Sequence, residues 1–130
     1  MFKEPGPSAP RSHSKYKRLN MLNRSIAIIK IKEPFLDWVK SLPTSNGKIT
    51  LAEINFNNTT YLLPEYDNDE EKEEIIFHYF DMIFERQLQE WGTILPERWP
   101  KTRDFKTFKE WFDIEFHPVE DLVDAPLRDG

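Results

Sequence analysis

The 130-residue sequence contains no cysteine and only four glycines. Without cysteine, disulfide bonds, thiolate metal ligands and a cysteine nucleophile are excluded. A loop that cradles a phosphate needs several glycines close together in the sequence. The glycines are far apart here, so P-loop and dinucleotide-binding motifs are excluded as well. They stand at Gly6, Gly47, Gly92 and Gly130.

Long apolar segments are also missing. The longest uninterrupted apolar run is short and lies between Ile26 and Ile29. A membrane-spanning helix needs about 18 or more apolar residues, and a signal peptide needs an apolar segment behind its basic start. Neither pattern is present, so we expect a cytoplasmic protein with no membrane insertion.

The net charge of −5 is unevenly distributed along the chain. Residues 1–24 carry six Lys or Arg against one Glu, whereas residues 25–130 carry a net charge of −10. Phosphate groups are neutralised by clustered Lys and Arg, so the acidic body argues against general nucleic-acid binding. The basic segment leaves one alternative function open, which is association with nucleic acid through residues 1–20.

Composition divides the chain into three parts. Residues 1–22 are rich in proline and serine and show no apolar periodicity, which predicts a disordered basic leader. Residues 23–124 hold most of the aromatic side chains, which make up 14% of the sequence, and are expected to form one α+β domain. Residues 125–130 are expected to be a flexible tail.

Two strands are predicted in the first half of the domain. Residues 25–31 are dominated by β-branched side chains, which favour an extended backbone. Residues 61–63 form a second short strand that ends at Pro64. The first strand is apolar on both faces, with Ile26 and Ile28 on one of them, so we expect it to be central and covered on both sides.

Helical periodicity predicts a short helix and a long helix. Pro34 suits the first turn of a helix over residues 35–41, and Thr50 has the capping-box partner Glu53 three residues on. The long helix is expected over residues 69–91, with one apolar stripe facing the core. This stripe consists of Ile76, Phe77, Phe80, Phe84, Leu88 and Trp91.

A last helix is expected to begin behind the capping residue Asp104. Its aromatic side chains repeat at helical spacing, and Pro118 is expected to end it at about residues 115–117. A third, edge strand would then cover residues 119–123. The order of elements predicts an α+β fold in which a small, about three-stranded sheet packs against one long helix and shorter helices.

Four blocks of the sequence occur in a recognisable order: Asn23-Arg-Ser25, Lys30-x-Lys-x-Pro-Phe-Leu-Asp-Trp38, Tyr61-Leu-Leu-Pro-Glu65, and Trp111-Phe-Asp113 followed by His117. Over about residues 22–123, the combination resembles a family of small uncharacterised bacterial proteins. The resemblance implies a bacterial, cytoplasmic origin and a domain that begins near the first block. It implies no activity, so no catalytic residue is carried over. The leader departs from the family pattern.

Asp113 and His117 are the candidate catalytic pair. They are spaced i, i+4 near the expected end of the last helix, where a base and its orienting carboxylate would fit. The alternative is a histidine that pairs with Asp113 and interacts with the C-terminal end of the helix dipole. No Gly-x-Ser-x-Gly motif accompanies them, so a hydrolase receives little support.

One polar face of the long helix offers candidate metal ligands. Carboxylate and imidazole groups there have the chemistry to bind a divalent cation. Such sites take ligands from several helices, however, and a solvated helix face explains the same pattern. We therefore expect no metal and no cofactor. The candidate ligands are Glu74, His78, Asp81 and Glu85.

Two surfaces are candidates for binding a partner. Arg98 and Trp99 lie in a loop bracketed by prolines, and Trp and Arg are enriched among interface anchors. Trp99 has an alternative interpretation, in which it folds back over the edge of the core. The segment from Glu65 to Glu74 holds seven carboxylates and one lysine, and is either a solvated helix start or a patch for a basic partner. Its candidate contacts are Glu70, Glu71 and Glu74.

Taken together, the sequence favours a small non-catalytic cytoplasmic protein that binds another protein, as an adaptor or regulator. The rival hypothesis is a small metal-dependent or hydrolytic enzyme that uses His78, Asp113 or His117. Nucleic-acid association through the leader is the third. The sequence sets no oligomeric state.

Overall fold

A computed structural model describes residues 21–45 and 47–123. The predicted leader over residues 1–20 and the predicted tail over residues 125–130 lie outside the described residues. Residues 21 and 22, which composition assigned to the leader, are instead the first residues of a strand. They pair with the rest of the sheet, because the backbone of Met21 lies opposite Glu120.

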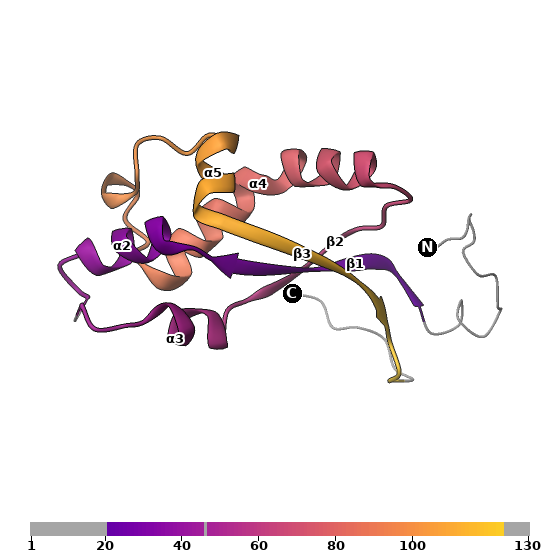
Figure 1. Ribbon diagram of the computed structural model, residues 1–130, viewed down its shortest axis with the longest axis horizontal. Coiled ribbons are helices and arrows are strands. Elements are labelled where there is room, and N and C mark those ends of the chain that lie inside the picture. The colour runs from indigo at the N-terminus through magenta and orange to yellow at the C-terminus, as the bar shows by residue number, and fades with distance from the viewer. Residues whose placement is uncertain (1–20, 46, 124–130) are drawn as a thin grey trace.

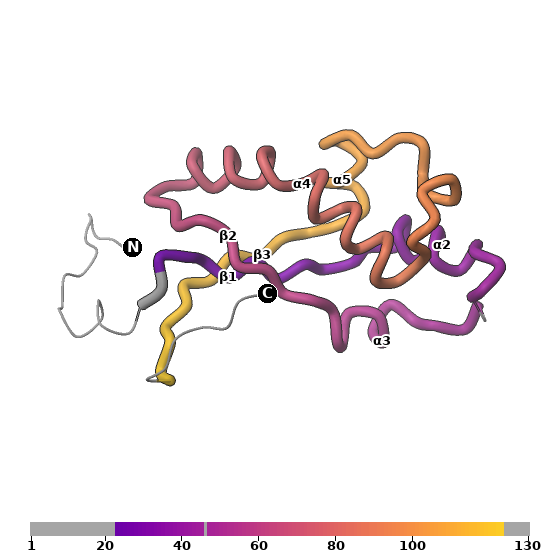
Figure 2. Tube along the Cα trace, turned by 180° about the vertical axis from the view of Figure 1, so that it is seen from behind, coloured from indigo at the N-terminus to yellow at the C-terminus, as the bar shows by residue number. Residues whose placement is uncertain are grey.

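The described residues form an α+β fold, as the sequence predicts (Figure 1). A three-stranded antiparallel sheet has the order β2-β1-β3, so the first strand is central as expected. Figures 1 and 2 show α4 and α5 on one side of this sheet, while α3 lies beside the end of β1, where its Asn55 side chain bonds to the backbone of Ile31. The elements are β1 (Met21–Ile31), α2 (Glu33–Ser41), α3 (Leu51–Phe56), β2 (Thr60–Pro64), α4 (Asp69–Trp91), the 3₁₀ turn η1 (Pro96–Arg98), α5 (Phe105–Trp111) and β3 (Phe112–Glu120).

The two faces of β1 have different surroundings. Ala27, Ile29 and Ile31 are buried against the helices. Ile26 and Ile28 lie on the opposite face and are only half-buried, so the expectation that both faces are covered is met on one face alone. The outer face is mostly charged further along the strands.

Two asparagine side chains complete the pairing of β1 where β2 stops. The register of β2 ends at Ile28. Beyond it, the Asn58 amide donates to the carbonyl of Ile29 at 3.1 Å, and the Asn55 amide both accepts from the N–H of Ile31 and donates to its carbonyl. Backbone groups left without partners are costly when buried, so these side chains take the place of a longer strand.

Aromatic rings fill the core between the sheet and the helices. Phe84 of α4, Phe108 of α5 and Phe112 of β3 are at most 1% exposed. Their ring centroids are 5.2 to 6.0 Å apart, within the range of favourable aromatic pairs. These three rings therefore join α4, α5 and the sheet into one core.

Gly92 allows a close approach at the end of α4. It is the C-cap of the helix, as its position in the sequence suggests. A Cβ atom there would lie 2.5 Å from Cζ3 of Trp38 and 2.8 Å from the carbonyl oxygen of Leu88. Any larger residue would displace Trp38 of α2, so glycine is required here by packing.

Several local predictions are confirmed. The capping box at Thr50 forms, with the Thr50 side chain accepting from Glu53 and Glu53 accepting from the Thr50 N–H. Asp104 caps α5 through a 2.8 Å hydrogen bond from the Thr107 N–H. Hydrogen bonds from the Thr107 side chain and from this N–H lower the pKa of the Asp104 carboxyl. The long helix covers Asp69–Trp91, as predicted.

The end of the last helix was predicted wrongly. α5 ends at Trp111, and β3 begins at Phe112 and continues through Pro118 to Glu120. Proline is compatible with this strand because β3 is an edge strand and one side of it needs no ladder partner. The expected third strand over residues 119–123 therefore begins seven residues earlier, at Phe112.

The apolar stripe of α4 also differs from the prediction. Ile76, Phe84 and Leu88 are buried as expected, but Phe77 is 62% exposed. Gln87 is fully buried instead, and its amide donates to the Tyr61 hydroxyl at 2.9 Å. Among residues 21–45 and 47–123, every helix is too short or too polar to cross a lipid bilayer.

Candidate functional site

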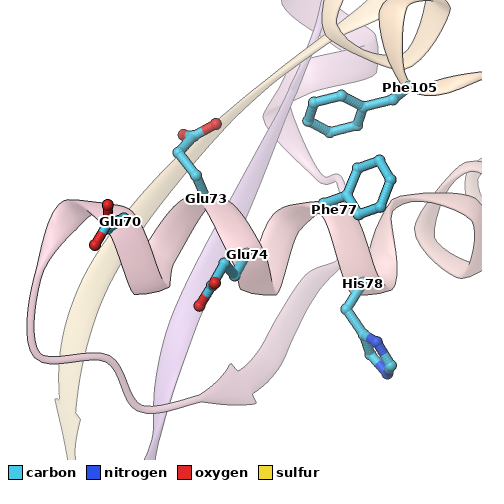
Figure 3. A pocket seen from close by; sticks show the side chains of 6 residues that line it. All are labelled: Glu70, Glu73, Glu74, Phe77, His78 and Phe105. Atoms are coloured by element: carbon cyan, nitrogen blue, oxygen red, sulfur yellow. The ribbon is translucent and has the colours of Figure 1, made fainter.

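An open groove lies between the first half of α4 and the start of α5 (Figure 3). It has a volume of about 660 Å³. Figure 3 shows the rings of Phe77 and Phe105 next to each other, with carboxylates on the adjoining turns of α4. We call it the acidic–aromatic groove. Its lining residues are Glu70, Glu73, Glu74, Phe77, His78 and Phe105.

The aromatic part of the groove is continuous with the core. The rings of Phe77 and Phe105 meet edge to face, with their centroids 5.3 Å apart. Phe80 contacts both of them, at 5.9 Å and 5.2 Å, and contacts the buried Phe108 on its other side. The series therefore runs from the core to the surface and ends at the exposed ring of Phe77.

The acidic part of the groove follows from how α4 begins. Asn68 caps the helix by accepting from the Glu71 N–H at 2.8 Å. Acidic residues in the first turns are favoured there because the helix N-terminus carries partial positive charge. Glu71 itself accepts from the Asp67 N–H, so its carboxylate stabilises the helix start. Glu70 and Glu74 form no ion pair with any other described residue.

A lysine from α5 lies at the rim of the groove. Lys109 Nζ is 5.4 Å from the centroid of the Phe105 ring and 3.4 Å from Oε1 of Glu73. A cation within about 6 Å of a ring centroid is attracted by the electrons of the ring face. The ammonium group of Lys109 therefore has an aromatic partner and a carboxylate partner at the same time.

A second, smaller groove adjoins the first on the other side of α4. Its volume is about 450 Å³. Glu74 and His78 belong to both grooves and form the ridge between them. The lining thus connects the end of β2 with the first turns of α4. It consists of Pro64, Glu65, Glu71, Glu74, Ile75, His78 and Tyr79.

The candidate anchors Arg98 and Trp99 have different surroundings. Trp99 is half-buried against the core, its indole N–H donates to the Thr93 carbonyl at 2.8 Å, and Arg103 lies over its ring. The side chain of Arg98 is exposed, while its carbonyl accepts from Trp38. These contacts give Trp99 a packing role, and its use in partner binding stays a prediction.

Replacing Trp99 by alanine is expected to destabilise the fold. The change removes a half-buried indole, its hydrogen bond and its contact with Arg103, and we expect the free energy of unfolding to fall by about 2 kcal/mol. Arg98→Ala should change it by less than about 0.5 kcal/mol, because only an exposed side chain is removed. Urea unfolding of both variants measures this. Equal stabilities of the two variants would contradict the packing role.

Asp113 and His117 do not form the pair that helical spacing predicted. Both lie on β3, where residues four apart are separated by about 13 Å. Asp113 pairs with Lys32 at 3.6 Å, and His117 lies 3.6 Å from Glu115. The hydrogen bond and charge of Lys30 lower the pKa of the Glu115 carboxyl. The Lys30–Glu115 and Lys32–Asp113 pairs therefore form a row of ion pairs along β3 on the outer face of the sheet.

The candidate metal ligands remain spread along α4. Within the part of the chain that the structure describes, no three His, Asp or Glu side chains lie close enough together to hold a metal ion. Glu74 and His78 line the grooves, whereas Asp81 and Glu85 lie on later turns of the exposed face of α4.

Glu70 and Glu74 are among the partner contacts predicted from the sequence, whereas the other groove residues Glu73, Phe77 and Phe105 are not. The sequence places Phe77 on the apolar stripe that faces the core, and Phe105 among the aromatic side chains at helical spacing in the last helix. Nothing in the sequence marks Phe77 as exposed, because neighbouring residues on the same helix, such as Ile83 and Phe84, are both buried.

Comparisons with protein-family models, with curated proteins and with solved structures found no match for this chain. The resemblance to a bacterial family therefore stays an interpretation of the sequence blocks.

Proposed function

We propose that this is a small non-catalytic cytoplasmic protein that binds another protein through the acidic–aromatic groove. The observation that carries the proposal is Phe77, which is 62% exposed and lines a groove together with three glutamates. Covering a Phe side chain on binding contributes roughly 1.5–3 kcal/mol, so an exposed ring in a depression is suited to act as an anchor.

The surroundings of the ring support a protein ligand. Phe77 contacts the rings of Phe80 and Phe105, so part of its surface is packed while the rest is an apolar surface open to a partner. The carboxylates around it supply a polar rim and a negative potential, which favours the encounter with partners of opposite charge.

Affinity capture from the native host tests this function. The tag is placed at the C-terminus, and Phe77→Ser is compared with Phe56→Ser, since Phe56 is 90% exposed on α3 and lies outside the groove. We expect a partner at near-equal amounts with the unmodified chain and with Phe56→Ser. With Phe77→Ser we expect recovery to fall about tenfold or more. A capture without a specific partner, or one that Phe77→Ser leaves unchanged, contradicts the proposal.

The same experiment examines the second candidate surface. Arg98→Ala removes an exposed charge without touching the packing of Trp99. If the groove is the binding site, Arg98→Ala captures as much partner as the unmodified chain. If Arg98→Ala alone lost the partner, the interface would be the loop around η1 and not the groove.

A further inference from the structure

Ammonium groups are bound in the same way at two places beside the first half of α4. At one, Lys109 lies over the Phe105 ring and contacts Glu73. At the other, Lys72 Nζ is 5.8 Å from the Tyr66 ring centroid and 3.5 Å from Oδ1 of Asp69. In both cases a cation is placed between an aromatic face and a carboxylate, a combination in which each partner strengthens the binding.

The same combination recurs at the centre of the groove, around Phe77. Its ring is exposed, and Glu70 and Glu74 on the neighbouring turns pair with no described cation. The chemistry that fits is a Lys or Arg side chain, preferably beside an apolar or aromatic residue that covers the ring. This specifies the ligand as a basic peptide segment rather than a small molecule.

We propose that residues 1–20 of the same chain occupy the acidic–aromatic groove and compete there with the partner. This segment carries five Lys or Arg against one Glu, a net charge of +4. The run Lys15-Tyr-Lys-Arg18 combines three cations with an aromatic ring. This composition matches the acidic and aromatic side chains that line the groove. The rest of the chain carries a net charge of the opposite sign, −9. The competition between this segment and a partner rests on the proposed function, whereas the contact between the segment and the groove does not.

The attachment point of the segment favours the contact. β1 begins at Met21, and Arg24 pairs with Pro64, which lines the second groove beside Glu74 and His78. Twenty extended residues reach up to about 66 Å, whereas the whole of α4 is about 35 Å long. A tethered segment of this length is present at an effective concentration of the order of millimolar, so a weak attraction suffices.

A spin label in the full-length chain tests the contact directly. Because the sequence has no cysteine, Ser14→Cys provides a single attachment site for a nitroxide. We expect the amide NMR signals of residues 70–78 and 105–109 to lose about half their intensity or more at low salt. The signals should recover at about 1 M salt, where the Debye length is about 3 Å.

Charge-reversal variants separate this contact from general attraction. Glu70→Lys with Glu74→Lys should abolish the signal loss. Glu85→Lys with Glu97→Lys reverses two exposed charges outside the groove and should preserve it. Phe77→Ser tests the same contact without changing the charge, and it should also reduce the signal loss. This variant is independent of any effect of the two introduced lysines on the start of α4. Equal signal loss over the whole acidic surface, or no loss, overturns the proposal.

Two further outcomes are distinguished by mixing and by capture. If an isotope-labelled chain without the label is broadened by a spin-labelled second chain, the segment binds between copies and the proposal of binding within one chain is wrong. Lys15→Ser with Lys17→Ser and Arg18→Ser should raise partner capture at least about threefold, because a competing segment is removed. If capture depends on Phe77 while the spin label reports no contact, the proposed function stands and this inference falls.

Discussion

Phe84→Ala is expected to lower the free energy of unfolding by about 3–5 kcal/mol. Phe84 is fully buried, and its ring contacts Phe108, Trp111 and Phe112 from α5 and β3. Truncation leaves a cavity where α4, α5 and the sheet meet, so contacts on several sides are lost at once. Since whole domains are stable by about 5–15 kcal/mol, much of the protein should be unfolded at moderate urea concentrations.

The matched control for this variant is on the same helix. Phe77→Ala makes the same chemical change at an exposed ring, and we expect a loss of about 1 kcal/mol from its contacts with Phe80 and Phe105. Urea denaturation followed by tryptophan fluorescence measures both variants. A loss at Phe77 as large as that at Phe84 would place Phe77 in the core and remove the basis for using it as an anchor.

Patterns confined to one element predicted that element well. The bounds of α4, the capping box at Thr50 and the cap at Asp104 depend on side chains within a few residues of each other. The central place of β1 is also confirmed, although the two apolar faces from which it was predicted are not both covered.

The error at residue 112 came from two periodicities that overlap. Phe105, Phe108 and Trp111 follow helical spacing, while Phe112, Ile114 and Phe116 alternate with Asp113, Glu115 and His117 as in a strand with one buried face. Phe112 fits both patterns. Pairing with β1 decides between them, because Ile31 lies opposite Phe112 and the strand register continues from there.

The site was less predictable than the fold because it joins two elements. Glu70 and Glu74 stand out in the sequence through their charge. Phe77 and Phe105, however, are 28 positions apart, and only the packing of α4 against α5 brings their rings to 5.3 Å. The aromatic surface is therefore formed only when α4 packs against α5, whereas the negative charge can be recognised in a single segment of the sequence.

Asn58→Ala is expected to cost about 2–4 kcal/mol of stability. The Asn58 side chain connects three segments: it donates to the Ile29 carbonyl of β1, and its Oδ1 accepts from the Trp91 indole at 2.9 Å and from the Thr59 N–H. Alanine leaves the strand carbonyl and the indole N–H without these partners in a partly buried place. The end of α4 then loses one of its polar links to the sheet, while the hydrogen bond from Gln87 to Tyr61 remains.

Asn57→Ala and Trp91→Phe make the Asn58 prediction specific. Asn57 is exposed next to Asn58, so its replacement should change the stability by less than about 0.5 kcal/mol. Trp91→Phe removes only the indole donor, and the double variant with Asn58→Ala should cost less than the sum of the two single changes because they share one hydrogen bond. Strict additivity in urea unfolding would show that the bond between Asn58 and Trp91 does not hold α4 to the sheet. The position of α4 on the sheet would then depend on its other contacts, which include the hydrogen bond from Gln87 to Tyr61.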